Sequence, residues 1–134
     1  MDILSSNIPH LTRTDFSPCG SLTRYTSGVA TVLFYTNSSR FSQTFIPEYE
    51  KLPAMCDGNC QALAVNMDQG TNNAIYSMST KFPYTITNFP TVVLYFNGDP
   101  CSIYLGERTA SSLFSQIKTI TNKQQCKFKF VPCE

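Results

Sequence analysis

Residues 33–52 read LFYTNSSRFSQTFIPEYEKL, and this stretch decides the fold that the sequence predicts. It begins with an apolar, aromatic run that continues from Val32 and is typical of a buried strand. Residues 36–38, Thr-Asn-Ser, interrupt the run with side chains that favour turns and helix starts. The spacing that follows predicts one helix that ends near Pro53, with Pro47 inside it and one buried face. That face carries Phe41, Phe45, Tyr49 and Leu52.

Length and composition exclude several classes of protein. The 134 residues suit one domain with its own hydrophobic core. The net charge of +1 and the scattered basic residues argue against nucleic acid as a partner. No apolar run approaches the ~20 residues that a membrane span needs. The N-terminus, MDILSSNIPH, lacks the basic flank and apolar core of a secretory signal, which predicts synthesis in the cytoplasm.

Two motifs carry a resemblance to a known family. Phe34 and Tyr35, followed in unbroken register by PEYEKL at residues 47–52, resemble the segment F-Y-A-P-W-C-G-H-C and its helix ending in P-E-Y-E-K-L. Residues 86–98, ITNFPTVVLYFNG, are similar to V-x-G-Y-P-T-x-x-x-F-x-N-G. Both patterns belong to thioredoxin-fold proteins, in particular to the catalytic domains of protein disulfide isomerases. The resemblance covers roughly residues 8–120. It implies an α/β, thioredoxin-like fold, with a central mixed sheet of about four to five strands flanked by helices.

The same resemblance places residues of this chain in the family's active site. Its register puts Ser39 and Ser42 where the family carries two redox cysteines, and Leu33 where it carries a buried acid. Pro90 matches the family's cis-proline, which faces that site. Disulfide exchange needs a thiolate at the helix start, and a serine hydroxyl does not ionise near neutral pH. We therefore expect no catalytic residue, no conventional oxidoreductase activity and no cofactor.

The old active-site surface retains features that suit protein binding. In the family, the backbone beside the cis-proline pairs with an extended peptide. By the same resemblance, an aromatic and cationic interface is expected from Ser39, Arg40, Phe41, Phe89 and Pro90. For Phe41 a second placement stays open, in the hydrophobic core beneath the helix.

Six cysteines need a separate explanation: Cys19, Cys56, Cys60, Cys101, Cys126 and Cys133. They indicate disulfides in a secreted chain, but free thiols, metal or redox chemistry in a reducing cytosol. The pair Cys56-x3-Cys60 is a structural disulfide, a pair of buried thiols or the centre of an atypical oxidoreductase, and no histidine or second close cysteine pair completes a zinc site there. A bond between Cys126 and Cys133 is predicted to close a tail loop. The family's topology implies that most of the cysteines lie opposite the old active site.

The remaining elements complete the predicted domain. Residues 8–16 are expected to form a short strand leading into a helix, residues 63–68 a strand, and residues 72–81 a weaker helix. Thr109 is expected to cap a last helix that turns Leu113, Phe114, Ile117 and Ile120 inward. We divide the chain into a thioredoxin-like domain, 1–121, and a tail, 122–134. Alternation in the tail predicts an added strand.

These features predict a redox-inactive thioredoxin-fold protein that acts in protein–protein binding or structural assembly. A minor capsid or virion component of a large DNA virus is the specific form that we expect. Such a protein is made inside a cell and used outside it, which reconciles the cysteines with the N-terminus. The alternatives are an atypical thiol–disulfide oxidoreductase that uses Cys56 and Cys60, and a chaperone-like peptide binder.

Overall fold

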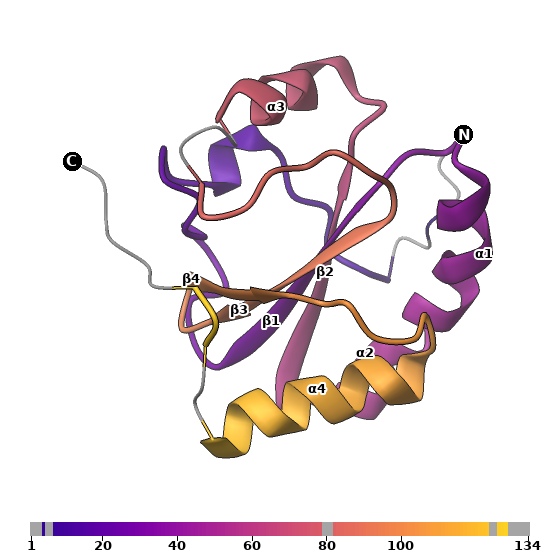
Figure 1. Cartoon of the computed structure of the whole chain (residues 1–134), viewed down its shortest axis with the longest axis vertical. Coiled ribbons are helices and arrows are strands. Elements are labelled where there is room, and N and C mark those ends of the chain that lie inside the picture. The colour runs from indigo at the N-terminus through magenta and orange to yellow at the C-terminus, as the bar shows by residue number, and fades with distance from the viewer. Residues whose placement is uncertain (1–3, 5–6, 79–81, 124–125, 129–134) are drawn as a thin grey trace.

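A four-stranded mixed sheet forms the centre of the molecule (Figure 1). The computed structural model describes residues 4, 7–78, 82–123 and 126–128. Its strands are β1 (Val29–Tyr35), β2 (Cys60–Asn66), β3 (Thr91–Phe96) and β4 (Asp99–Ile103). They lie in the order β2-β1-β3-β4, with β1 parallel to β2 and the other pairs antiparallel. The predicted mixed sheet is confirmed, with four strands.

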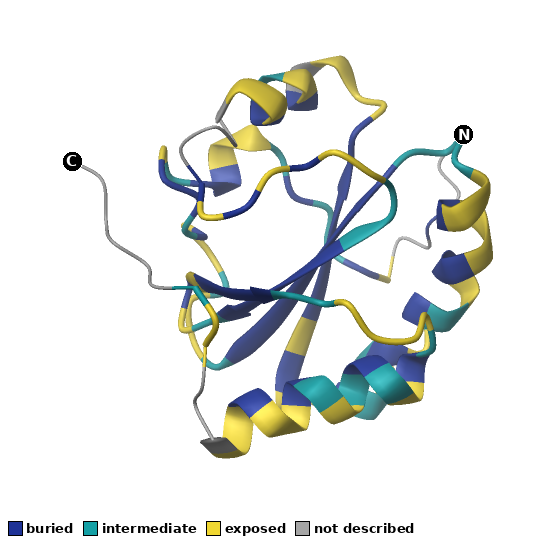
Figure 2. Ribbon diagram, viewed as in Figure 1, coloured by how far each residue is buried: buried dark blue, intermediate teal, exposed yellow. Residues whose placement is uncertain are grey.

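Strand β1 is central because both of its faces are apolar. All seven of its residues are buried, and they alternate between two hydrophobic clusters. Val29, Leu33 and Tyr35 face one cluster, whereas Ala30, Val32 and Phe34 face the other. A strand covered on both sides reads as a continuous apolar run, which is the pattern of this segment. Figure 2 shows the buried strands surrounded by helices whose outer faces are exposed.

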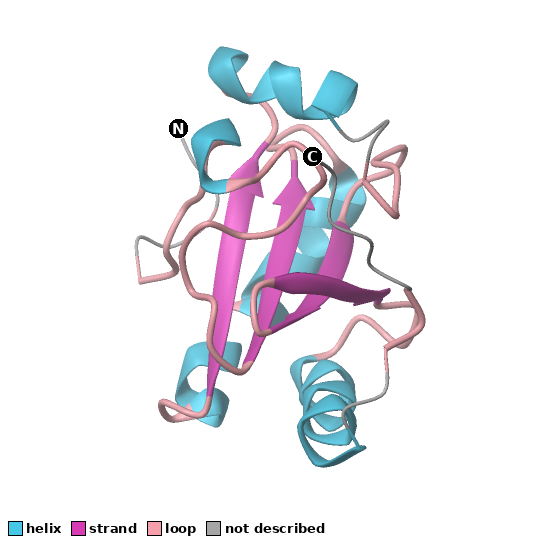
Figure 3. Cartoon of the chain, turned by 90° about the vertical axis from the view of Figure 1, so that its left-hand side faces the viewer, coloured by secondary structure: helices cyan, strands magenta, loops and turns pink. Residues whose placement is uncertain are grey.

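Helices cover the two faces of the sheet unequally. One face packs against α1 (Arg40–Tyr49), α2 (Leu52–Cys56) and α4 (Ala110–Lys123). The other packs against the region of the short helices η1 (Arg13–Asp15), η2 (Gly70–Asn73) and α3 (Ala74–Met78). Figure 3 shows the strands running through the centre of this arrangement. No helix in the described parts of the chain has the length and apolar character needed to cross a membrane.

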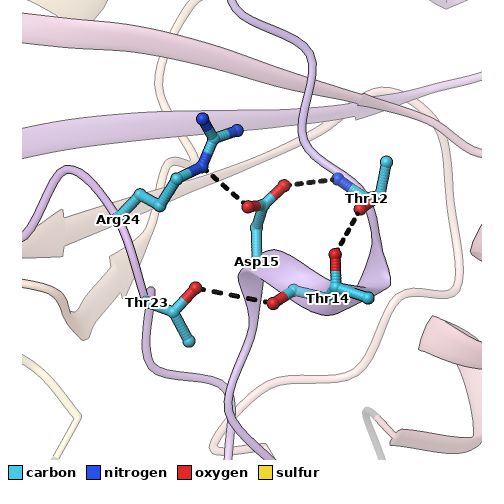
Figure 4. Close-up of polar contacts among 5 residues, drawn as sticks. All are labelled: Thr12, Thr14, Asp15, Thr23 and Arg24. Atoms are coloured by element: carbon cyan, nitrogen blue, oxygen red, sulfur yellow. Dashed lines mark hydrogen bonds and ion pairs between the residues drawn. The ribbon is translucent and has the colours of Figure 1, made fainter.

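The N-terminal segment departs from the prediction of a strand and a helix. Residues 8–16 contain one isolated bridge, from His10 to Ala64, followed by the three-residue helix η1. The Asp15 carboxylate accepts the backbone N–H of Thr12 at 2.8 Å and the Arg24 Nε–H at 2.8 Å (Figure 4). These bonds close a tight turn. The expected helix, which Pro18 and Gly20 were predicted to limit to a turn or two, is this single 3₁₀ turn.

The predicted helix of residues 40–52 is two helices, so that prediction is wrong in its extent. Helix α1 ends at Tyr49, and α2 begins at Leu52 with Pro53 in its first turn. Proline has no N–H to continue the hydrogen bonds of a preceding helix, but it suits the first turn of a new one. Pro47 lies inside α1, as predicted.

Other boundaries follow the sequence more closely. Asn97 and Gly98 have φ values of 51° and 87°, the left-handed conformation that a tight hairpin turn needs. Helix α4 begins with a hydrogen bond from Ser112 N–H to Thr109 Oγ1 (3.2 Å) and continues to Lys123, past the predicted boundary at residue 121. Its Leu113, Ile117 and Ile120 are buried, whereas Phe114 is half-buried. The weaker helix predicted at 72–81 is η2 and α3, which end at Met78; residues 79–81 lie outside the described residues.

Candidate functional site at the start of helix α1

Ser39 joins the start of α1 to the segment before β3. It is the N-cap residue of α1, and its Oγ accepts the backbone N–H of Ser42 at 3.2 Å. The same hydroxyl donates to the Phe89 carbonyl at 3.3 Å. The next peptide bond, between Phe89 and Pro90, is cis. The structure therefore brings together Ser39, Phe89 and Pro90, which the sequence separates by 50 residues.

Ser42 occupies an apolar environment without a hydrogen-bond partner. The residue is fully buried, and its Oγ contacts no donor or acceptor in the described part of the chain. An unsatisfied buried hydroxyl costs about 1–3 kcal/mol. A thiol is a weaker hydrogen-bonding group and behaves as a small apolar side chain when it is buried. The site would thus suit a cysteine better than the serine that it holds.

The groups that would move protons during disulfide exchange lie elsewhere or are replaced. Leu33 is fully buried in the cluster that includes Phe45 and Val92, so the position of the family's acid is apolar. His10 Nε2 lies 3.0 Å from the Tyr35 hydroxyl, and its Nδ1 lies 3.0 Å from the Ile8 carbonyl. Both nitrogens are therefore engaged: the Nε2 contact holds the N-terminal segment against β1, and the Nδ1 contact lies within that segment.

Large apolar side chains are exposed around Pro90. Phe41 is 62% exposed, which places it outside the core, and the Arg108 guanidinium lies 5.2 Å from its ring centroid. Tyr76 is 40% exposed and meets the half-buried Phe89 edge to face, with 6.4 Å between ring centroids. Leu105 is 83% exposed. The surface formed by Phe41, Tyr76, Phe89, Pro90, Leu105 and Arg108 is called the Pro90 face below.

A groove of about 330 Å³ forms part of this face. Pro90, Leu105 and Arg108 line it, together with the polar residues Thr85, Thr87 and Asn88. Arg40 is also exposed, at the first turn of α1. Beside Tyr76, burial and then the negative charge of Asp68 raise the pKa of the Tyr76 hydroxyl. Two cations lie next to Phe41: Arg40 precedes it in the chain, and Arg108 lies over its ring.

Sequence reasoning missed three members of the Pro90 face, Tyr76, Leu105 and Arg108. Arg108 was within reach, because it lies in the segment Gly106–Thr109 that resembles the family's G-x-R-T. Tyr76 and Leu105 gave no signal, since their exposure depends on how α3 and the loop after β4 pack.

Comparison with known proteins bears on the fold. No protein-family model and no curated protein matches the chain. Among solved structures, form II of human ERp44 has a TM-score of 0.69 at 23% identity, over 88% of this chain and 31% of that chain. The zinc-bound form of human ERp44 has a TM-score of 0.66 at 23% identity, over 85% and 31%. The chain has a thioredoxin-like fold.

A third structure supports the same conclusion. The J-Trx1 fragment of ERdj5 has a TM-score of 0.66 at 19% identity, over 86% of this chain and 52% of that chain. This chain therefore spans about a third of the ERp44 chains and half of the ERdj5 fragment. At such identities the similarity establishes the thioredoxin-like fold that the two motifs predicted, and it carries no statement of activity.

The cysteines of this thioredoxin-like fold form disulfides away from the Pro90 face. Cys56 bonds to Cys60, and Cys101 bonds to Cys126. Cys19 is also disulfide-bonded, and Cys133 lies outside the described residues. The predicted tail loop between Cys126 and Cys133 is wrong. Cys126 bonds to Cys101 instead because residues 126–128 fold back onto β4. There the N–H groups of Lys127 and Phe128 donate to the Cys101 carbonyl.

The register of the sheet places Cys60 at the opposite end of β1 from Ser39. Cys60 pairs with Val29 at the start of β1, whereas Tyr35 at the end of β1 leads into α1. Six residue steps along a strand span about 20 Å. Cys56 and Cys60 are both buried. No group of three or more His, Cys, Asp or Glu side chains in the described ranges has the arrangement of a metal site.

Proposed function

We propose that this chain is a redox-inactive thioredoxin-fold module that binds a partner protein through the Pro90 face. One observation carries the proposal. All of the large hydrophobic side chains that are markedly exposed in the described residues, Phe41, Tyr76 and Leu105, lie around Pro90. Aromatic and arginine side chains at the centre of a surface are typical of protein interfaces.

The chemistry of the site supports binding rather than exchange. Ser39 and Ser42 supply hydroxyls where exchange needs thiols, and both are committed to the helix start or to the interior. Cys56 and Cys60 are joined to each other and buried, which favours a structural role over turnover. Disulfides also suit a protein that is used outside the reducing cytosol. A structural component of a virus particle is the setting that we propose.

The first experiment tests the binding surface. The intact protein is titrated with a panel of extended peptides while its backbone amide signals are followed by NMR. Shifts are expected at residues 39–42, 85–91 and 104–108, and Phe41→Ala and Phe89→Ala are expected to abolish them. Lys118→Ala, on the exposed side of α4, is the control because it lies over Phe114 away from this face. Shifts confined to other surfaces would exclude the proposal.

A second experiment separates the module from an atypical oxidoreductase. The native, unreduced protein is alkylated and its peptides are mapped by mass spectrometry. We expect Cys56 and Cys60 to resist alkylation until the protein is both unfolded and reduced, because they are bonded to each other. Rapid alkylation at neutral pH after brief exposure to a mild dithiol, with reoxidation by a disulfide substrate, would instead identify a redox centre at Cys56 and Cys60.

A further inference from the structure

Residues from two chain segments of different chemistry line the groove of the Pro90 face. Thr85, Thr87 and Asn88 come from the segment before β3, and Leu105 and Arg108 come from the segment after β4. Its volume of about 330 Å³ lies at the lower end of the range of ligand pockets. The space suits one or two side chains of an extended segment, and a folded element would not enter it.

The segment before β3 presents backbone groups that the fold leaves unused. Tyr84 and Ile86 are buried while Thr85 and Thr87 are exposed, which is the alternation of an extended strand. Yet residues 85–87 belong to no strand of the sheet. Within the described parts of the chain, no residue forms a hydrogen bond with the backbone of Thr85, Ile86 or Thr87. An extended peptide can pair with such a segment as an added strand.

The segment after β4 presents a cation without an acidic partner among the described residues. The ion pairs between described residues join Arg24 to Asp15 and Lys51 to Glu48, and Arg108 takes part in neither of them. The Phe41 ring holds one face of its guanidinium, at 5.2 Å from the ring centroid. Stacking on an aromatic ring leaves the N–H groups at the edge of a guanidinium able to bind a carboxylate.

We propose that the partner segment is an extended peptide that places an aspartate or glutamate side chain on Arg108. This inference rests on the proposed function and names the chemistry that its binding site selects. The carboxylate is assigned to Arg108 because Arg108 lines the groove and has no acidic partner among the described residues, whereas Asp68 beside Tyr76 would repel it. A small or apolar side chain next to the carboxylate then contacts Leu105, while the peptide backbone pairs with Thr85–Thr87.

Selection from a library gives the test without a known partner. Random eight-residue peptides displayed on phage are selected on the intact, oxidised protein, and the bound sequences are counted. We expect Asp or Glu to be enriched at one position among peptides that Phe89→Ala fails to retain. Binders without an acidic position, or no binders at this face, would overturn the inference.

A charge-exchange experiment then assigns the carboxylate to Arg108. The best acidic peptide and its Glu→Gln or Asp→Asn counterpart are titrated against the wild type, Arg108→Gln and Arg13→Gln. Arg13 is the matched control because it is an exposed arginine in η1. For Arg108→Gln we expect a loss of about five- to tenfold in affinity for the acidic peptide and less than twofold for the neutral one.

The outcomes separate this inference from the proposed function. Equal losses for both peptides, or an equal effect of Arg13→Gln, would overturn the role of Arg108. If neutral peptides still bind and Phe89→Ala still releases them, the Pro90 face stands as an interface without acidic specificity. If no peptide binds this face, both proposals fail.

Discussion

The two ends of β1 and β2 differ in what their polar and sulfur-containing side chains do. At the end that leads into α1, Ser39 and Ser42 carry hydroxyls, and aromatic side chains are exposed. At the other end, and along β4, cysteines are bonded in pairs and mostly buried. The comparison teaches that this thioredoxin-like fold uses its described cysteines for covalent cross-links, away from the Pro90 face, where we propose that a partner binds. Each prediction below tests one side of that contrast.

The largest effect is expected from returning thiols to the start of α1. The double variant Ser39→Cys with Ser42→Cys should form a disulfide and raise thiol–disulfide exchange at least about tenfold above the wild type. The N-terminal end of a helix lowers the pKa of a thiol placed there. Turnover of a fluorescent glutathione disulfide measures the gain. Ser39→Cys alone is the control, since one thiol forms a mixed disulfide that has no neighbour to resolve it. A double variant that folds without forming the bond would break the comparison.

Removing a disulfide should cost more stability where the bond closes a longer loop, with a logarithmic dependence on loop length. Cys101 and Cys126 are 25 residues apart, and Cys56 and Cys60 are 4 apart. The chain-entropy relation gives a loss in the free energy of unfolding of about 3.5 kcal/mol for Cys101→Ala with Cys126→Ala. For Cys56→Ala with Cys60→Ala the loss is about 2 kcal/mol. Urea denaturation without reductant measures both. The reverse order would mean that the short bond does more than restrict the unfolded chain.

A smaller effect, of opposite sign, is expected at Ser42. Ser42→Ala and Ser42→Cys should each raise the free energy of unfolding by about 1 kcal/mol, because each removes a buried hydroxyl that has no partner. Ser102→Ala is the control, since Ser102 is also largely buried but lines a surface pocket that water can enter. Loss of stability in both Ser42 variants would show that its hydroxyl has a partner in solution, such as a water molecule.

The sequence predicted the fold well because its strongest signals are local. The apolar run of β1, the proline motif before β3 and the hairpin turn at Asn97 and Gly98 each fix a backbone conformation over a few residues. The division between α1 and α2 was missed because the periodic spacing continues across it, whereas Pro53 starts a new helix.

The candidate site was harder to predict than the fold. Ser39, Phe89 and Pro90 were available from a resemblance in register, but the exposure of Tyr76 and Leu105 follows from tertiary packing. The partner of Cys126 was missed for the same reason. Its bond to Cys101 depends on residues 126–128 folding back onto β4, which no local pattern specifies.

The smallest effect concerns the polar link between α1 and α4. Glu48 accepts the Ala110 N–H at 3.0 Å and pairs with Lys51. The hydrogen bond from Lys51, and then that from Ala110, lowers the pKa of Glu48 below its ordinary value of 4.5. A carboxylate whose pKa is lower in the folded state stabilises the fold above its ordinary pKa. That contribution is lost as the pH falls through the pKa of Glu48 in the folded state.

Glu48→Gln should therefore flatten the decline in the free energy of unfolding below about pH 4.5, measured by urea denaturation at a series of pH values. Glu107→Gln removes an equal charge from the exposed loop before α4 and should leave the decline unchanged. An unchanged decline in Glu48→Gln would mean that this link does not help to hold α1 against α4, and that packing alone does so.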